Sequence, residues 1–175
     1  LSVDTFRSGI AKAAVDEGAD LINDISAGAM DPAMFKTISE LKVPYSMMHL
    51  RGTPQTMATQ TNYTNLIVEI AQYFAEKIQI LKDLGVKDLI IDPGFGFGKT
   101  LAHNLSLFNA IDQFVETGHP VLVGVSRKAM IGQMLGIQQA DQRLIGSVAM
   151  ALLAAQRGAA ILRVHDVLET KQAID

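Results

Sequence analysis

The sequence predicts an α/β fold in which parallel strands alternate with helices. Six short apolar runs are spaced along the 175 residues, and each is followed by a longer segment with helical signals. The runs are continuously apolar rather than alternating, which is typical of strands covered on both faces. The six predicted strands are residues 1–4, 19–23, 43–48, 86–91, 120–125 and 159–164.

The helices between the first four strands are predicted from capping signals and apolar spacing. Residues 6–17 form a helix that stops near Gly18. Asp31 is the predicted N-cap of the next helix, with Pro32 at its first helical position, and this helix runs to about residue 41. A polar loop, residues 49–61, precedes a long helix that Gly85 ends. Its apolar positions recur at helical spacing and are Ile67, Ile70, Ala71, Phe74, Ile78 and Leu81.

Helical segments also follow the last three strands. They are predicted at residues 105–115, at 127–135 and 141–156 with a break at Gly136, and from about Val167 onward. A closed barrel of eight βα units takes roughly 250 residues, or about 31 per unit. At that rate the chain holds between five and six units, which matches the strand count. The sequence therefore predicts a (β/α)8 (TIM) barrel, present in incomplete form with about six βα units.

A single domain spanning residues 1–175 is expected, because a chain of this length that is 49% hydrophobic can bury one sizeable core. Residues 1–4 already form the end of a strand, and residues 170–175 stop part-way into a helix. We therefore expect a barrel that lacks its first two βα units and the end of its last helix.

Composition narrows the possible partners. The net charge of −3 argues against nucleic acid, whose binding proteins present a strongly basic face. The longest apolar run, residues 144–155, is too short to span a membrane. The absence of cysteine excludes disulfides and thiolate metal sites, and fits a cytoplasmic protein.

Polar side chains end all six predicted strands. In a parallel α/β fold the carboxyl ends of the strands meet at one edge, which is where ligands bind. Helix capping does not explain the set, because Lys, Arg and His do not cap helix N-termini. The residues are Asp4, then Asn23 and Asp24, then His49 and Arg51, then Asp92, then Ser126 and Lys128, then Arg163 and His165.

The fourth strand ends in a glycine-rich segment, residues 92–100. It is not a Walker A loop, because Pro93 stands where the first glycine would be needed. It is not a dinucleotide fingerprint either, because Lys99 stands where the third glycine would be needed. The segment is a turn that carries the chain from a buried strand with a terminal carboxylate, Asp92, into a helix.

The predicted site is bipolar. Arg163 and His165 share one strand face and form a plausible anion site, and Ser126 aligns with Lys128 if strand geometry continues through them. Carboxylates at Asp4, Asp24 and Asp92 suit a ligand edge with paired N–H donors, each such contact being worth about 1.5–3 kcal/mol. The pattern indicates acidic groups for a donor-rich heterocycle and basic groups for an anion.

Six strand-end motifs, in order and across the whole chain, resemble those of the dihydropteroate synthase family. They are SVDT (2–5), INDIS (22–26), MHLRGTP (48–54), DPGFGFGK (92–99), GVSRK (124–128) and RVHD (163–166). The resemblance implies a (β/α)8 barrel that joins 6-hydroxymethyl-7,8-dihydropterin diphosphate to p-aminobenzoate with release of diphosphate in folate biosynthesis. It also implies a sulfonamide target and a homodimer joined through C-terminal helices.

Carried over position by position, the resemblance assigns roles to ten residues. The catalytic residues would be Arg163, His165 and Lys128, and Arg163 and His165 would also hold the diphosphate. The p-aminobenzoate site would be bounded by Phe97, Ser126 and Lys128. The pterin would be bound by Asp4, Asn23, Ile25, Met48, Asp92, Lys128 and Arg163.

The resemblance implies Mg²⁺ as a cofactor that assists the diphosphate. The family's metal ligand, an Asn, belongs to the units expected to be missing, so no metal ligand is predicted in this chain. Two alternatives stay open: a non-catalytic pterin-binding fragment, and a pterin-binding methyltransferase that uses methyltetrahydrofolate.

Several residues near the motifs have no assigned role. Phe95 is expected to pack into the barrel rim, Lys99 is either a solvated loop lysine or part of the site, and His49 is either structural or a support for the site. The remaining four are expected at the surface or rim: Arg51, His103, His119 and Arg127.

Overall fold

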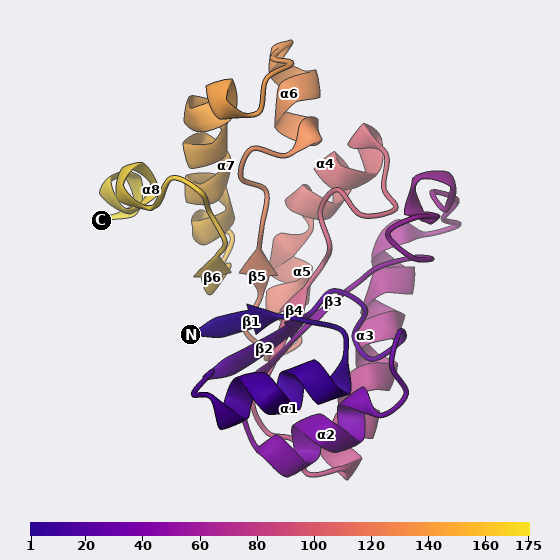
Figure 1. The fold of residues 1–175 in the computed structure, drawn as a ribbon. Coiled ribbons are helices and arrows are strands. Elements are labelled where there is room, and N and C mark those ends of the chain that lie inside the picture. Colours follow the sequence, from indigo (N-terminus) through magenta and orange to yellow (C-terminus); the bar gives the residue numbers. More distant parts are fainter.

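The computed structural model describes residues 1–175 and contains six strands that alternate with one or two helices each (Figure 1). All six predicted strands exist, and each is shorter than predicted: β1 to β4 occupy the C-terminal part of the predicted run, with β2 and β4 ending one residue beyond it, and β5 and β6 occupy the middle. The strands are β1 (Ser2–Asp4), β2 (Leu21–Asp24), β3 (Tyr45–Met48), β4 (Leu89–Asp92), β5 (Leu122–Val123) and β6 (Ile161–Leu162).

Every strand pair is parallel, and neighbours in space are neighbours in the chain. Strands β1 to β4 form one sheet in that order, β5 pairs with β6, and a single bridge between Ile91 and Val121 joins the two groups. Chain-order pairing is the pattern of a barrel, whereas a doubly wound sheet reverses its order at a switch point. The prediction of an incomplete (β/α)8 barrel is confirmed.

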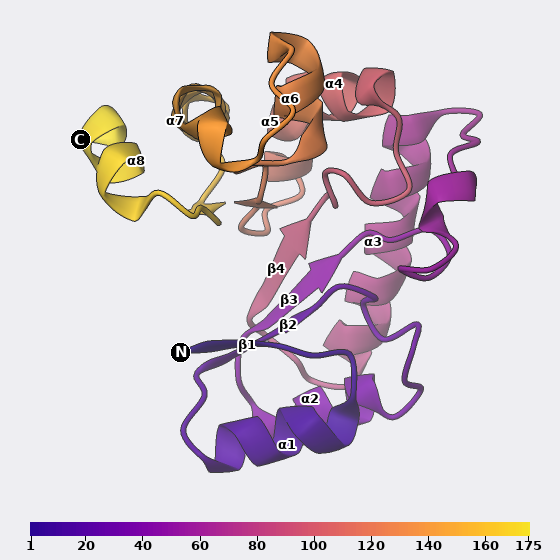
Figure 2. The ribbon, with the colours of Figure 1, turned by 45° about the horizontal axis from the view of Figure 1, so that its top comes forward.

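The helices cover the outside of this curved sheet. Figures 1 and 2 show α1 and α2 side by side below the four-stranded sheet, α3 along its flank, and α7 and α8 beyond β6. No helix is both long and apolar enough to cross a membrane. The helices are α1 (Ser8–Asp16), α2 (Met34–Leu41), α3 (Leu66–Asp83), α4 (Leu101–Asn109), α5 (Ile111–Val115), α6 (Ala129–Leu135), α7 (Leu144–Gln156) and α8 (Val167–Ile174), with 3₁₀ turns at Met57–Thr59 and Asp141–Arg143.

The predicted cap of the second helix was wrong. The helix begins at Met34 rather than at Pro32, and its N-cap residue Ala33 makes no side-chain cap. The Asp31 carboxylate instead accepts hydrogen bonds from Ala33 N (3.0 Å) and from Ser8 N (2.7 Å), the first residue of α1. These hydrogen bonds, above all the one from Ser8, lower the pKa of Asp31. Asp31 therefore ties the start of α1 to the turn before α2, a contact between residues far apart in sequence.

Two other helical predictions also need correction. The segment 105–115 is not one helix, because α4 begins earlier, at Leu101, and ends before Ala110, and α5 starts at Ile111. The segment 141–156 opens with a 3₁₀ turn before α7 begins at Leu144. Arg127 stands outside α6, because its backbone is left-handed (φ +57°) and the helix starts at Ala129.

The core lies between the sheet and the helices. Helix α3 buries Leu66, Ile70, Phe74, Ile78 and Leu81. Four of these five belong to the stripe that the apolar spacing predicted, whereas the predicted Ile67 is only partly buried and the predicted Ala71 is exposed. Burying each such side chain stabilises the fold by about 1.5–3 kcal/mol. This packing fixes β3 and β4, and their carboxyl ends carry Met48 and Asp92 into the candidate site.

Candidate functional site

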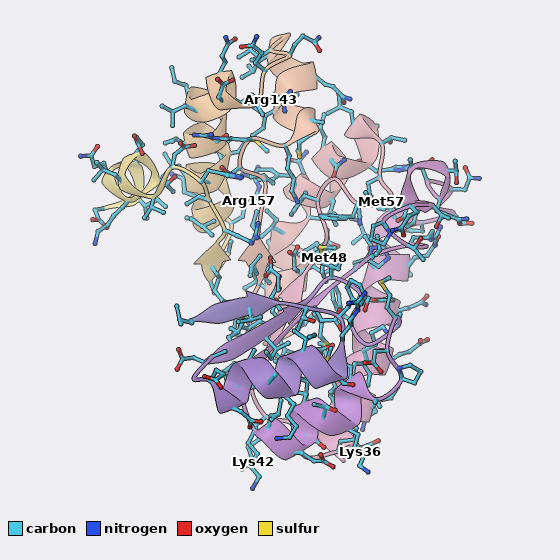
Figure 3. The ribbon with its side chains drawn as sticks, viewed as in Figure 1. Lys36, Lys42, Met48, Met57, Arg143 and Arg157 are labelled. Carbon is cyan, nitrogen blue, oxygen red and sulfur yellow. The ribbon has the colours of Figure 1, made fainter.

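A cavity of about 440 Å³ opens at the carboxyl edge of the strands. All ten residues to which the sequence assigned roles line it, although they come from loops and strands spread over most of the chain. Met48, at the end of β3, lies near the middle of the molecule between the four-stranded sheet and the upper helices (Figure 3). The lining residues are Asp4, Asn23, Ile25, Met48, Asp92, Phe97, Gly124, Ser126, Arg127, Lys128, Ala140, Arg163 and His165.

The buried floor of the cavity is formed by Asn23, Met48 and Asp92, which are 7%, 3% and 7% exposed. Asn23 Nδ2 donates to Asp4 Oδ1 at 2.9 Å, whereas Asn23 Oδ1 is buried without a partner. An unpaired buried acceptor costs free energy until a donor reaches it. A ligand N–H is such a donor, so the floor is suited to a heterocycle with N–H groups on its edge.

Asp92 is the most buried carboxylate of the cavity. Its Oδ1 accepts a hydrogen bond from Gly94 N at 2.8 Å. Burial raises the pKa of Asp92, and the nearby Lys128 ammonium opposes this shift. Burial also lowers the pKa of Lys128, with Asp92 acting in the opposite direction. Lys128 Nζ contacts the Phe95 carbonyl oxygen and lies 4.8 Å from the centre of the Phe97 ring. Carboxylate, ammonium and aromatic ring thus form one wall.

The rim of the cavity is exposed and cationic. Arg163, which follows β6, donates through Nη2 to Asp4 Oδ2 at 2.9 Å, and the two side chains are 59% and 52% exposed. This ion pair joins the first strand to the last across the mouth of the cavity. An exposed pair is worth about 0–1 kcal/mol, so an incoming anion can displace the Asp4 carboxylate from Arg163 at little cost.

Ser126 orients the imidazole of His165. The His165 backbone N–H donates to Ser126 Oγ (3.2 Å), and that hydroxyl lies 2.9 Å from His165 Nδ1. The hydroxyl accepts the backbone hydrogen and can also donate its own hydrogen to Nδ1, which selects one of the two neutral tautomers of the imidazole. Neutral His165 then carries its proton on Nε2, where it can donate to a ligand. Ser126 is itself buried, so this pairing is fixed before any ligand binds.

The expected alignment of Ser126 with Lys128 along a strand is wrong, because β5 ends at Val123 and Arg127 adopts a left-handed conformation. The turn still delivers both side chains to the cavity. It also carries Arg127 into an ion pair with Asp166, with Nε 3.1 Å from Oδ2. This hydrogen bond raises the pKa of Arg127 and lowers that of Asp166. Arg127 is therefore a paired wall residue rather than a solvent-facing charge.

The glycine-rich turn separates its two phenylalanines. Phe95 is fully buried and lies edge-on to Phe108, with 6.0 Å between ring centres, whereas Phe97 is half-buried and lines the cavity. Gly94 has φ +77°, and a Cβ there would lie 2.1 Å from the His49 carbonyl oxygen. Only glycine fits this close approach.

Three of the residues without assigned roles, Lys99, His49 and Arg51, are held by contacts within the protein and support the loops around the cavity. Lys99 is 9% exposed and is therefore not a solvated loop lysine. His49 is buried between the rings of Tyr63 and Tyr73, and burial lowers the pKa of His49 to about 3. Arg51 is not solvent-facing, since it pairs with Glu69 and lies 4.0 Å from the centre of the Tyr63 ring.

Three lining residues were missed by sequence reasoning. Gly124 and Arg127 flank Ser126 in a motif that was recognised, so the motif itself was a usable signal for them. Ala140 comes from the loop before α7, and nothing in the sequence marks it. The predicted acidic group Asp24 does not reach the cavity. Its carboxylate is fully buried and accepts hydrogen bonds from Ser26 and Tyr45.

The chain contains no group of three or more His, Asp or Glu side chains able to hold a metal ion. The carboxylates that line the cavity are Asp4, paired with Arg163, and Asp92, bound to Gly94 N. Mg²⁺ needs several oxygen ligands in near-octahedral geometry. The residues present therefore do not form a Mg²⁺ site by themselves.

Comparison with known proteins gives one consistent result. Residues 1–165 match the family model described as pterin binding enzyme. The dihydropteroate synthase of Escherichia coli K12 is 41% identical over 176 aligned positions, which cover 99% of this chain and 62% of that protein. The chain therefore spans less than two thirds of the length of this curated relative.

Solved structures agree with this result. Xanthomonas albilineans dihydropteroate synthase with 4-aminobenzoic acid superposes with a TM-score of 0.93 at 42% identity, covering 99% of this chain and 62% of the other. The same enzyme in complex with 7,8-dihydropteroate gives a TM-score of 0.92 at 41% identity, covering 99% and 66%.

Proposed function

Because the chain belongs to the family of pterin-binding enzymes, we propose that the complete protein of which it is part is a dihydropteroate synthase. It condenses 6-hydroxymethyl-7,8-dihydropterin diphosphate with p-aminobenzoate to give 7,8-dihydropteroate and diphosphate. The observation that carries the proposal is the convergence of ten residues from six strand ends on one bipolar cavity. A pterin diphosphate has the matching polarity, with N–H donors at one end and an anion at the other.

The pterin binds on the buried floor in this proposal. Asp92 and the unpaired Asn23 Oδ1 accept hydrogen bonds from the ring's N–H groups. Met48 and Ile25 supply apolar surface for the ring faces, and Lys128 lies beside Asp92 to donate to a ring acceptor. Floor residues are packed before the ligand arrives, so little ordering entropy is lost on binding.

The diphosphate binds at the rim, where Arg163 and His165 donate to its oxygens. Arg163 leaves or shares its ion pair with Asp4, and His165 presents Nε2–H because Ser126 holds Nδ1. Charge-assisted hydrogen bonds to diphosphate are stronger than neutral ones. They strengthen further as negative charge accumulates on the leaving group, and that difference lowers the barrier.

The second substrate enters beside Phe97, where Ser126 and Lys128 also line the cavity. The C–O bond between the pterin methylene and the diphosphate breaks with its electron pair going to diphosphate. The lone pair of the aniline nitrogen forms the new C–N bond, and the nitrogen then loses a proton to the departing diphosphate or to water. The chain's contribution is positioning and charge stabilisation, so no protein nucleophile is required.

Mg²⁺ is proposed only as a companion of the diphosphate, with its protein ligands coming from outside these 175 residues. The carboxylates of this cavity are already engaged, Asp92 by Gly94 N and Asp4 by Arg163. Titration of Mg²⁺ into the 175-residue chain without diphosphate should give no binding heat above that of a blank.

We also propose that the complete protein forms a homodimer through α7 and α8, which pack against each other. Helix α7 has no charged residue from Leu144 to Gln156, and its Ile145 is 84% exposed. In α8, Val167 and Leu168 are each 65% exposed. Clustered exposed apolar side chains favour association. Light scattering should report a dimer that Ile145→Asp shifts to monomer, and a monomeric wild-type protein at high concentration would refute this interface.

Turnover tests the proposed synthase activity. The complete protein should release diphosphate only when the pterin diphosphate and p-aminobenzoate are both present. Methyl transfer from methyltetrahydrofolate would instead favour the methyltransferase alternative. Assaying the 175-residue chain in parallel tests the other alternative, a non-catalytic pterin-binding fragment, which predicts pterin binding without turnover.

A further inference from the structure

The glycine-rich turn between Asp92 and Thr100 is held from several sides by side chains, of which Lys99 and Asn104 are buried and Tyr63 and Lys128 half-buried. Every residue from Gly94 to Gly98 has a backbone group bonded to a side chain of another residue. Tyr63 OH donates to Gly98 O at 3.1 Å, and Asn104 Oδ1 accepts from Gly96 N at 2.7 Å. Lys128 contacts the Phe95 carbonyl oxygen. The two remaining residues, Gly94 and Phe97, are both held through their carbonyl oxygens by Lys99.

Lys99 contributes the central bonds of this arrangement. Its Nζ lies 2.9 Å from Gly94 O, 3.0 Å from Phe97 O and 3.0 Å from His49 Nδ1. An ammonium has three N–H donors, and these three acceptors use all of them. The backbone oxygen of Lys99 in turn accepts from Asn104 Nδ2 at 3.3 Å, so the two side chains brace the turn together.

The burial of Lys99 is costly, and nothing in its contacts offsets that cost through an ion pair. It is 9% exposed, and burial lowers the pKa of Lys99 to about 7, although the Asp92 carboxylate opposes the shift. A methionine of similar length would occupy the same space without desolvating a charge. Since Lys99 does not line the cavity, direct contact with a ligand does not explain it either.

What Lys99 fixes is the position of Phe97. Its acceptors Gly94 O and Phe97 O lie on either side of the turn, and Phe97 N donates to the same Gly94 O at 3.2 Å. The Phe97 ring is the aromatic surface that this turn presents to the cavity. Three glycines with positive φ would otherwise leave the turn free to adopt other conformations.

We propose that Lys99 is a positioning residue that holds Phe97 at the cavity wall and thereby sets the affinity for an aromatic amine substrate without touching it. The proposal rests on the proposed synthase function for the identity of that substrate. The pterin floor depends less on these Lys99 hydrogen bonds than Phe97 does, because Asn23, Met48 and Asp92 are all held by strand pairing and only Asp92 also contacts the turn, through Gly94 N. Loss of the Lys99 hydrogen bonds to Gly94 O and Phe97 O, called the tether below, should therefore weaken the binding of p-aminobenzoate and leave the binding of the pterin diphosphate nearly unchanged.

The first test is Lys99→Met in the complete protein, which removes three donors and keeps the side-chain length. The KM for p-aminobenzoate should rise about 10-fold or more, while the KM for the pterin diphosphate changes by less than about threefold. Lys36→Met is the matched control, because Lys36 is exposed on α2 at the far end of the molecule (Figure 3). Equal increases in both KM values, or no change in either, would overturn the proposal.

Two further variants keep the test decisive if Lys99→Met does not fold. Asn104→Ala removes the acceptor of Gly96 N and should give the same separation of the two KM values. Phe97→Leu should suppress the effect of either change, so that in its background the added loss is less than about twofold. Full additivity with Phe97→Leu would contradict the proposal, since it would show that the tether acts elsewhere.

Hydrogen exchange tests the role of Lys99 without depending on synthase activity, so that this proposal and the proposed function can fail independently. Hydrogen exchange of peptides covering residues 94–98 should speed up in Lys99→Met and remain unchanged in Lys36→Met. A wild-type protein that lacks synthase activity would refute the proposed function. The exchange measurement would still show whether Lys99 holds the turn in place. Unchanged exchange in Lys99→Met would refute the tether whatever the activity.

Discussion

The floor and the rim of the cavity are built in different ways. The floor consists of buried groups with fixed partners, such as Asp92, which is 7% exposed and bound to Gly94 N. The rim consists of exposed groups such as Arg163, whose ion pair with Asp4 connects the first strand of the four-stranded sheet to the last strand of the two-stranded sheet. One end of the ligand therefore meets a preformed surface, whereas the other meets charges that are free to rearrange.

Asp92→Asn tests the floor and should give the largest loss. The amide keeps an oxygen for Gly94 N but presents N–H donors toward the donors of the ligand. A buried group that must accept hydrogen bonds from a ligand discriminates strongly against a replacement that cannot accept them. We therefore expect kcat/KM to fall about 1,000-fold or more, with little change in thermal stability. Asp88→Asn, at the exposed residue just before the same strand, is the control and should leave kcat/KM unchanged. A loss below about 10-fold would remove Asp92 from the recognition of the pterin.

Arg163→Met tests the rim and should have the next largest effect. The KM for the pterin diphosphate should rise about 100-fold, and its dependence on salt should weaken, because an exposed cation acts through a field that salt screens. Folding stability should change by less than about 1 kcal/mol, as the pair with Asp4 is exposed. Lys171→Met, which removes an exposed cation in α8, should leave both the KM and its salt dependence unchanged. An undiminished salt dependence in Arg163→Met would place the anion elsewhere.

His49→Gln tests the support beneath the floor through pH. Burial lowers the pKa of His49 to about 3, so the unfolded chain takes up a proton below about 6.5 and the folded chain does not. The free energy of unfolding therefore falls as pH drops from 6.5 toward 3, by up to about 1.4 kcal/mol per pH unit from this residue. Urea unfolding between pH 4.5 and 6.5 should show a shallower slope in His49→Gln. Identical slopes would mean that His49 does not carry this dependence.

Asp4→Asn should have the smallest effect on activity. It compares the exposed carboxylate of the cavity with the buried carboxylate, Asp92. Asp4 is exposed, and its amide replacement can still accept from Asn23 Nδ2. We expect folding stability to change by less than about 1 kcal/mol and kcat/KM to fall about 10-fold, far less than in Asp92→Asn. If the two variants lose activity equally, burial is not what separates floor from rim.

The strand-end residues were predictable because their placement follows from topology. Parallel strands in chain order bring their carboxyl ends to one edge, so Asp4, Met48, Asp92 and Arg163 meet wherever the exact strand bounds lie. Errors of one or two residues at the strand ends did not matter for this reason. The motif predicts Phe97 rather than Phe95 as the site residue, and the geometry agrees, since Phe97 lines the cavity and Phe95 is fully buried.

The tertiary pairings were not predictable from the sequence. Lys99 is buried among three hydrogen-bond acceptors that come from two segments of the chain. The spacing of residues in the sequence does not predict such an arrangement. Arg127 finds Asp166 39 residues away, and Asp31 binds Ser8 N rather than capping its own helix. A capping motif predicts only a local partner, and here the distant N–H of Ser8 binds the same carboxylate as the local N–H of Ala33.

Binding of the pterin with and without its diphosphate tests the contrast between floor and rim most directly. Calorimetric titrations would compare the complete wild-type protein with Asp92→Asn and Arg163→Met. We predict that Asp92→Asn weakens both ligands alike, whereas Arg163→Met weakens the pterin alcohol only slightly, through its lost contact with the ring, and removes most of the affinity that the diphosphate adds. The account would be contradicted if Arg163→Met weakened both ligands equally, or if the diphosphate added no affinity to the wild-type protein.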